Sequence, residues 1–252
     1  FLTSCQISGL TNGASYSAKV KVINGPSTQA GFSSTVTSST NAVTVYGPPS
    51  TINNLRVVVG HDAGDGSISV TWEAPTQSNG MSLTGYSVTL TNQTRSVVAQ
   101  TCSVGLSDSL SCLFQGLTNG DSYLVAVVAL NGQSSLPVTS TAVPYGLPGP
   151  VRNPVLRGGS ALADGTLLIS WASAIANGSP VTYSVTVFDE GNQPVGNSCN
   201  PTSSGETWTC AVTGLINGKY YTATIVATNG SDSFSTVTIS DAVMVYGPPD
   251  AA

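Results

Sequence analysis

Residues 116–123 read Gly-Leu-Thr-Asn-Gly-Asp-Ser-Tyr, and this pattern occurs three times along the chain. The other two copies begin at Gly9 and Gly214 and lead to Tyr16 and Tyr221. In each copy an Asn stands eight residues beyond the Tyr, and a closing Tyr-Gly-X-Pro follows. The Asn residues are Asn24, Asn131 and Asn229, and the closing tyrosines are Tyr46, Tyr145 and Tyr246. A period of about one hundred residues indicates a repeated domain, because solenoid units are much shorter.

Two of these repeats are complete, and the first is only the tail of one. It begins at Phe1, where the other repeats have already used more than half of their length. A β-sandwich without its first strands exposes sheet edges and half a core. We therefore expect domains at residues 1–47, 48–146 and 147–252, the first of them partial. We also expect that the chain is a piece of a longer protein, or that another chain supplies the missing strands.

Alternation of apolar and polar residues predicts β-strands in both complete repeats. In the middle repeat the alternating runs are 55–59, 68–72, 86–90, 123–129 and 138–143. Tight-turn signals at Asp65-Gly66 and Asp164-Gly165 separate the first two strands of each repeat. No segment shows sustained helical periodicity. About seven short strands per repeat predict an all-β fold of tandem Ig-like β-sandwiches.

The motifs resemble those of fibronectin type III domains. The residues that carry the resemblance, besides the Gly-Leu-x-Asn-Gly-x-x-Tyr motif, are Trp72, Trp171, Tyr86 and Tyr183. The resemblance implies a tyrosine corner formed by Leu117 with Tyr123 and by Leu215 with Tyr221. We expect each phenol to satisfy a backbone carbonyl that the corner leaves unpaired. The resemblance covers essentially the whole chain and concerns the fold, because this sandwich hosts many unrelated functions.

Four of the five cysteines occupy the same places in the two complete repeats. The disulfides that this predicts are Cys102 with Cys112 and Cys199 with Cys210. A loop this short should stabilise its domain by roughly 2–3 kcal/mol. Cys5 aligns with Cys112 and Cys210, so its partner would fall before Phe1. A zinc site would need Cys-x-x-Cys steps or nearby His residues, and the sequence has neither.

The composition excludes several classes of function. Only 8% of the residues are charged, against about a quarter in typical soluble domains. The net charge is −5 and the basic residues are scattered, so we expect no nucleic-acid partner. No apolar run approaches the roughly 18 residues of a membrane span. Paired cysteines favour an extracellular protein, secreted or at the cell surface, and the Gly-, Ser- and Thr-rich, Lys-poor composition suggests a bacterial source.

We find no constellation of residues for catalysis, a cofactor or a metal. The single histidine, His61, lies beside Asp62 and Asp65 in a Gly-rich turn. Catalysis would need a nucleophile and an orienting group, and a metal would need more ligands. Calcium would need denser oxygen ligands than Asp62 and Asp65 supply. We therefore predict a solvated turn here and a protein that is not an enzyme.

Three further features have two interpretations each. Asp189-Glu190 is a carboxylate pair, but the Gly191-Asn192 that follows predicts a hairpin tip. Trp208 either presents a surface aromatic ring to a sugar or partner protein, or packs across strands beside Cys210. The glycosylation pattern, which matters only in a eukaryotic secretory pathway, fits Asn92, Asn177 and Asn229.

The linkers point to a function. Tyr46-Gly-Pro-Pro and Tyr145-Gly-Leu-Pro-Gly-Pro leave little slack, and Pro stiffens them. We expect a non-enzymatic extracellular structural module that forms a semi-rigid rod, stalk or filament subunit. Its partners would be other copies of itself or neighbouring modules of a longer chain. Two alternatives stay open: an adhesive module that recognises a surface glycan or protein, and a spacer region of a secreted polysaccharide-degrading enzyme.

Overall fold

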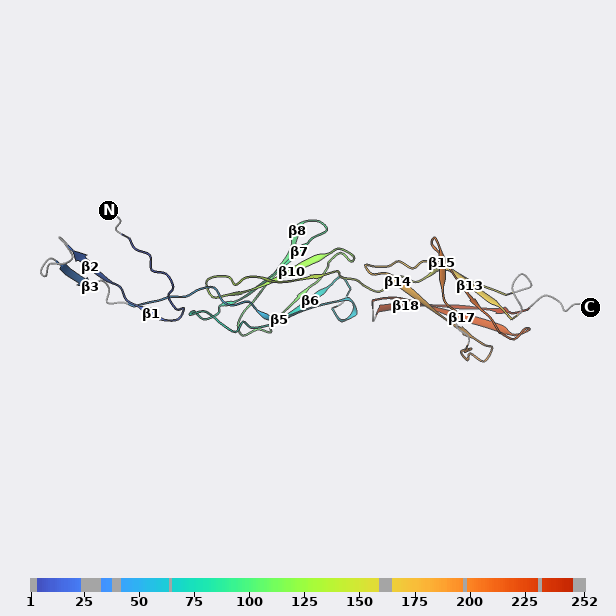
Figure 1. The fold of residues 1–252 in the computed structure, drawn as a ribbon. Helices are drawn as coiled ribbons and strands as arrows, with labels where there is room; N and C mark the ends of the chain where they lie inside the picture. The colour runs from blue at the N-terminus through green and yellow to red at the C-terminus, as the bar shows by residue number, and fades with distance from the viewer. Residues whose placement is uncertain are drawn as a thin grey trace, which may run out of the picture.

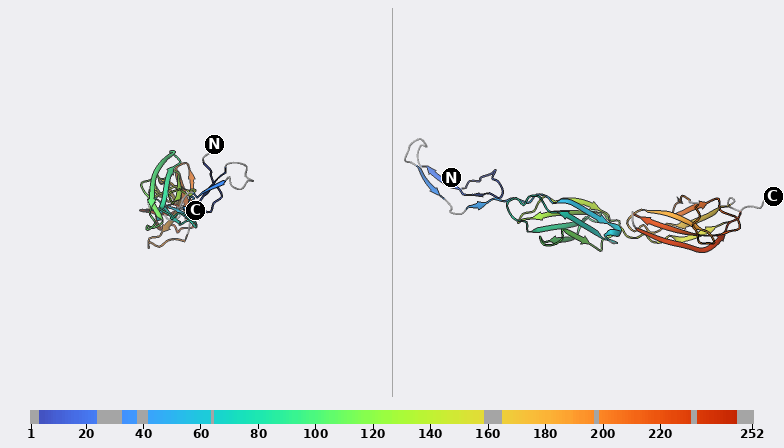
Figure 2. Two further views of the ribbon diagram at one scale, coloured as in Figure 1. Left: turned by 90° about the vertical axis from the view of Figure 1, so that its left-hand side faces the viewer. Right: turned by 90° about the horizontal axis from the view of Figure 1, so that it is seen from below.

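The computed structural model describes residues 4–23, 33–37, 42–63, 65–158, 165–196, 199–230 and 233–246. These residues form β-strands and one short 3-10 helix, η1 (Gly60–Asp62). Figures 1 and 2 show two sandwiches and a thinner N-terminal part lying one after another along one axis. No helix among the described residues is long and apolar enough to cross a membrane.

The strands fall into three groups, which we name for use below. The N-terminal segment has β1 (Ser15–Tyr16), β2 (Lys19–Ile23), β3 (Ser33–Thr37) and β4 (Val43–Thr44). The middle module has β5 (Asn53–Val59), β6 (Ile68–Glu73), β7 (Gly85–Asn92), β8 (Val97–Val104), β9 (Ser111–Phe114), β10 (Tyr123–Leu130) and β11 (Val138–Ala142). The C-terminal module has β12 (Arg152–Arg157), β13 (Leu167–Ala172), β14 (Val181–Phe188), β15 (Thr202–Ser204), β16 (Thr207–Val212), β17 (Tyr220–Asn229) and β18 (Ser233–Met244).

The middle module is a sandwich of two antiparallel sheets, ordered β5-β6-β9 and β11-β10-β7-β8. Its strands alternate between buried and more exposed residues, as the apolar pattern predicts. Residues that face inward from both sheets form the core, and the largest fully buried ones are Phe114, Ile68, Leu90, Val70, Val88, Val125 and Val127. The predicted all-β sandwich fold is therefore confirmed.

The C-terminal module has the same plan with one strand moved to the other sheet. Its sheets are ordered β12-β13-β16-β15 and β14-β17-β18. After β14 the chain turns back, and Phe188 forms only an isolated bridge with Pro194. Pairing beside β14 continues for one residue more, where Val195 N donates to Val187 O at 2.9 Å. The chain then crosses to the opposite sheet, where β15 pairs with β16.

The N-terminal segment contains two small antiparallel pairs, β1 with β4 and β2 with β3. The backbone N–H of Thr11 donates to the phenol oxygen of Tyr16 at 2.9 Å. The segment meets the middle module near Gly13 and Gly47. Asn24, the first of the repeated Asn residues, lies outside the described residues.

Candidate functional site at the joints between modules

The tyrosine corner positions the loop that reaches the next module. Tyr123 and Tyr221 are buried, and each phenol oxygen accepts a hydrogen bond from the backbone, donated by Thr118 and Ile216, both at 3.0 Å. The expected bond from the phenol to a carbonyl stays a prediction, and the hydrogen bond that the structure shows runs from a backbone N–H to the phenol oxygen. The N–H lies one residue after Leu117 or Leu215, so the corner fixes the following Asn-Gly.

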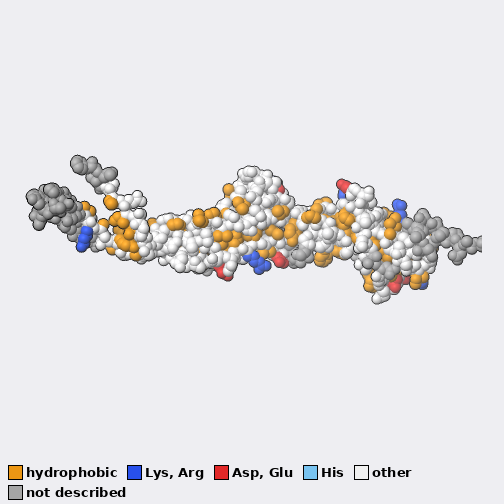
Figure 3. All heavy atoms as spheres, viewed as in Figure 1, with side chains coloured by type: hydrophobic (Ala, Val, Ile, Leu, Met, Phe, Trp, Pro, Cys, Tyr) orange, Lys and Arg blue, Asp and Glu red, His pale blue; other side chains and the backbone are white. Residues whose placement is uncertain are grey.

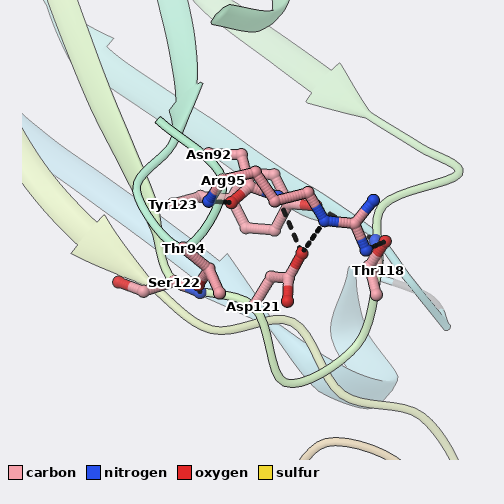
Figure 4. Close-up of polar contacts among 7 residues, drawn as sticks. All are labelled: Asn92, Thr94, Arg95, Thr118, Asp121, Ser122 and Tyr123. Carbon is pink, nitrogen blue, oxygen red and sulfur yellow. Dashed lines mark hydrogen bonds and ion pairs between the residues drawn. The ribbon is translucent and has the colours of Figure 1, made fainter. Parts of the chain in front are cut away.

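An ionic clasp holds the same loop from its other side. In the middle module the Asp121 carboxylate lies 3.0 Å from Arg95 Nε and accepts a hydrogen bond from Asn92 at 2.8 Å (Figure 4). Arg95 also donates to the Thr118 hydroxyl at 3.3 Å. The clasp ties the turn after β7 to the loop before β10, so this end of the module is held at two points.

The C-terminal module has a clasp with the charges reversed. The Glu190 carboxylate accepts hydrogen bonds from the Tyr220 N–H at 3.1 Å and from the Lys219 ammonium at 3.4 Å. These two donors lower the pKa of Glu190 below its ordinary value. An acid on the turn and a base on the loop thus replace the base and acid of the middle module, which indicates that the connection is kept rather than the residues.

The second joint, between the middle and C-terminal modules, holds the linker by hydrogen bonds from two loops. Asn177 accepts from Gly146 N at 3.1 Å through its backbone carbonyl, and its side-chain amide donates to Leu147 O at 2.9 Å. Asn229, only 1% exposed, donates to Gly146 O at 2.9 Å and to Ala176 O at 2.6 Å. The polar groups of the linker are therefore paired with the module that follows it.

One side-chain amide connects the two modules directly. Asn119 Nδ2 donates to the Asp65 carboxylate at 2.6 Å within the middle module and to Asn177 Oδ1 of the C-terminal module at 2.8 Å. Beside this contact the backbones of Gly120 and Gly178 pack together, and a Cβ on Gly178 would lie 2.8 Å from Gly120 N. Both glycines have φ near +90° (84° and 96°), a region that other residues rarely adopt.

A tyrosine ring is wedged across the same joint. A Cβ on Gly230 of the C-terminal module would lie 2.5 Å from Tyr145 Cε2, and a Cβ on Gly60 of the middle module would also meet the Tyr145 ring. The ring of Tyr145 therefore has a glycine from each module against it. Only residues without a side chain allow such an approach, so the sequence fixes the place of the ring between the two modules.

The first joint, between the N-terminal segment and the middle module, repeats the hydrogen bonds of the second. Gly47 N donates to Asn79 O at 3.0 Å, and Asn79 Nδ2 donates to Pro48 O at 2.7 Å. Asn131, which is fully buried, donates to Gly47 O at 2.9 Å and to Ser78 O at 2.7 Å. Gly80 packs against the backbone of Gly13 as Gly178 does against Gly120. Two joints with different linker sequences thus share one geometry.

The repeated Asn-Gly loops and the tight linkers were predicted from the sequence, but this role of the Asn residues was not. In the sequence, Asn131 served only to align the repeats, and Asn229 also fitted the glycosylation pattern. A signal was present, because each Asn interrupts an apolar alternating strand at its end and stands directly before a Gly. A polar side chain at a position that the pattern buries must find hydrogen-bond partners, and here the partners are linker carbonyls.

The structure joins Cys102 to Cys112 and Cys199 to Cys210, while Cys5 is unpaired and exposed. The first bridge links β8 to β9, which belong to opposite sheets, and the second links the segment before β15 to β16.

The tryptophans on the second strands lie in the two cores. Trp72 and Trp171 are buried, with ring centroids 5.7 Å from Tyr86 and 5.5 Å from Tyr183, respectively. Trp208 packs on Tyr183 at 4.8 Å and donates to Ser173 Oγ at 3.1 Å. The cross-strand interpretation of Trp208 therefore describes it, and its ring is half-buried rather than presented to a ligand.

The remaining candidates are accounted for locally. Asp189 Oδ1 accepts hydrogen bonds from the N–H groups of Gly191 and Gln193, both at 2.9 Å, as in a turn. The amide nitrogens of Asn92, Asn177 and Asn229 all donate hydrogen bonds within the fold. The side chain of His61 lies outside the described residues. Among the described residues no three His, Cys, Asp or Glu side chains gather as metal ligands would.

These modules define a class of protein, the all-β chains built from Ig-like sandwiches in tandem. Residues 47–141 match the family model of the fibronectin type III domain. Over these residues the chain contains a fibronectin type III domain, as the motifs of the middle repeat predicted. A solved structure that it is similar to is that of the FN1–FN3 domains of chicken CNTN1, with 14% identity and a TM-score of 0.40, covering 79% of this chain and 70% of that one. A bacterial source stays a prediction.

Proposed function

We propose that this chain is a non-enzymatic structural module that forms a semi-rigid extracellular rod, stalk or filament subunit. The observation that carries the proposal is the repeated joint, in which Asn side chains and backbone groups of Gly hold the linker in one geometry twice. A chain built for free movement between modules would leave its linker groups to water. Here the backbone N–H of Gly47 and of Gly146 donates to the module that follows, and the carbonyl of each glycine accepts a hydrogen bond from that module.

The arrangement of the modules supports an extended shape. The three groups of strands follow one another from one end of the molecule to the other (Figure 1). The end-on view in Figure 2 superposes the two sandwiches. Because the same joint geometry recurs, each further module of this kind would continue the same axis. We propose the boundaries 1–47, 48–146 and 147–252 for these units, with other copies or neighbouring modules of a longer chain as partners.

The surface suits a passive role outside the cell. Figure 3 shows few charged side chains on the face in view. Each of the two modules carries a disulfide, and such bonds persist in oxidising compartments. The adhesive alternative loses its best aromatic candidate, because Trp208 packs on Tyr183. Recognition of a glycan, and a place beside a catalytic domain, have no specific observation in their favour.

The proposal is tested by measuring the distance between spin labels on the middle and C-terminal modules. We expect a narrow distribution of distances for the natural sequence. Tyr145→Ala removes the ring between Gly60 and Gly230, so we expect a broad distribution. The control is Tyr246→Phe, which changes an exposed tyrosine away from this joint. A broad distribution for the natural sequence would show hinged modules and overturn the rod.

A further inference from the structure

Asn-Gly dipeptides occur eight times in this chain, and most of them lie at the joints. Those at the first joint are Asn12, Asn79 and Asn131, and those at the second joint are Asn119, Asn177 and Asn229. Asn-Gly is a chemically labile pair, because the Gly has no Cβ to obstruct its own backbone nitrogen. That nitrogen attacks Cγ of the Asn side chain, a ring forms, and the side-chain nitrogen leaves as ammonia. Water then opens the ring to aspartate or isoaspartate, with no oxidant or reductant involved.

The joints place these amides in different surroundings. Asn131 and Asn229 are 0% and 1% exposed, and each amide nitrogen donates to two backbone carbonyls. Water has little access to them, and the leaving nitrogen is held. Asn119 is only partly buried, and its contacts come from two side chains, Asp65 and Asn177. Its amide is therefore reachable whenever the joint opens.

We propose that Asn119-Gly120 is a site of spontaneous deamidation whose conversion releases the C-terminal module from the middle module. The NH2 group of Asn119 is the donor to both Asp65 and Asn177. A carboxylate in its place has no hydrogen to donate. It would also set a second negative charge against Asp65 and an oxygen against Asn177 Oδ1, which is repulsive. The product therefore cannot re-form the contact, and the conversion persists after the opening of the joint that allowed it.

Asn217 provides the matched comparison within the same chain. It occupies the same loop of the C-terminal module, and Gly218 N is held by Val245 O at 2.8 Å as Gly120 N is held by Pro144 O at 3.0 Å. Its side chain is exposed, and its Oδ1 accepts a hydrogen bond from Gly165 N at 3.2 Å. The reaction at Asn217 therefore reports the same loop away from the second joint, and the reaction at Asn119 reports the loop with that joint closed.

The first experiment incubates the whole chain at mildly alkaline pH and follows aspartate and isoaspartate by peptide mapping with mass spectrometry. We expect Asn217 to react several-fold faster than Asn119, and Asn131 and Asn229 to react slowest. Tyr145→Ala opens the joint without touching the Asn119 contacts, so it should raise the rate at Asn119 to that at Asn217 and leave Asn217 unchanged. Equal rates at Asn119 in both proteins would overturn the gating by the joint.

The second experiment measures the distance between labelled modules in Asn119→Asp and in the matched variant Asn217→Asp. Both variants add the same charge in the same loop, so we expect a broadened distribution only for Asn119→Asp. This inference rests on the closed joint of the proposed rod, and different outcomes overturn the inference and the rod. A natural chain with a broad distribution would overturn the rod. A narrow distribution in Asn119→Asp, with the natural chain also narrow, would overturn the deamidation switch alone.

Discussion

Single polar residues orient whole modules in this protein, because each lies where an apolar strand ends. Asn229 closes β17 with its side chain at 1% exposure, although its neighbours along the strand are the apolar residues of the core. Its amide nitrogen is divided between the linker carbonyl of Gly146 and the carbonyl of Ala176 in the loop before β14. One side chain thus fixes the linker and the loop against each other.

We expect Asn229→Ala to lower the free energy of unfolding of the C-terminal module by about 1–3 kcal/mol, because the carbonyls of Gly146 and Ala176 lose their donor. Urea unfolding followed by the fluorescence of Trp171 and Trp208 measures this loss. Asn200→Ala, which truncates an exposed side chain, is the control and should change little. Equal stabilities of the two variants would show that the carbonyls find water instead.

The tyrosine corner allows a second prediction at this scale. Tyr123→Phe keeps the ring in the core and removes the acceptor of the Thr118 N–H. We expect a loss of about 1–2 kcal/mol in the free energy of unfolding of the middle module, because the part-buried hydrogen bond of the Thr118 N–H is lost. Tyr46→Phe, at a tyrosine that is 46% exposed, serves as the control. Urea unfolding followed at two wavelengths measures the stability of both variants. An unchanged midpoint for Tyr123→Phe would contradict the role of the phenol oxygen as acceptor.

At the level of strands, most of what the structure contains could be predicted, since period-two alternation encodes which face of a strand is buried. The runs of apolar residues near 55–59, 68–72 and 123–129 coincide with β5, β6 and β10. The exchange of one strand between sheets could not be predicted. It depends on where the chain packs after the turn that follows β14, which is a matter of tertiary structure that local alternation does not encode. Cross-module contacts were also beyond the sequence, because alternation says nothing of how one sandwich meets the next.

The disulfide of the middle module acts between elements and gives a third prediction. Cys102 on β8 and Cys112 on β9 connect opposite sheets across 10 residues of sequence. Replacing both with Ser should lower the free energy of unfolding by roughly 2–3 kcal/mol, mainly by freeing the unfolded chain. Chemical denaturation measures the change. A reducing agent should bring the middle module of the natural protein to the stability of the variant and leave the variant unaffected; if reduction had no effect, the bridge would not be formed in solution.

The whole molecule depends on how closely the linker approaches the loops beside it, and the two joints differ in one testable respect. A Cβ on Gly146 would overlap Asp65 Oδ1 and lie 2.6 Å from Asn177 Nδ2, one group from each module. A Cβ on Gly47 would lie 2.8 Å from Asn12 Nδ2, the end of a flexible side chain that can move away. Neither glycine has a positive φ, so Ala introduces a side chain without straining the backbone.

We therefore expect Gly146→Ala to bend or loosen the second joint, and Gly47→Ala to leave the first joint nearly unchanged. Small-angle X-ray scattering measures the result as a shorter maximum dimension for Gly146→Ala. Gly196→Ala, where no atom lies within 4 Å of the added Cβ, is the control. The unfolding midpoints of the modules should stay the same in all three variants, because no substituted residue lies in a hydrophobic core. If Gly146→Ala kept the full maximum dimension, the cluster of Asp65, Asn119 and Asn177 would not be what aligns the modules. The repeated hydrogen bonds of the linker and the ring of Tyr145 would then be the remaining contacts that hold the rod straight.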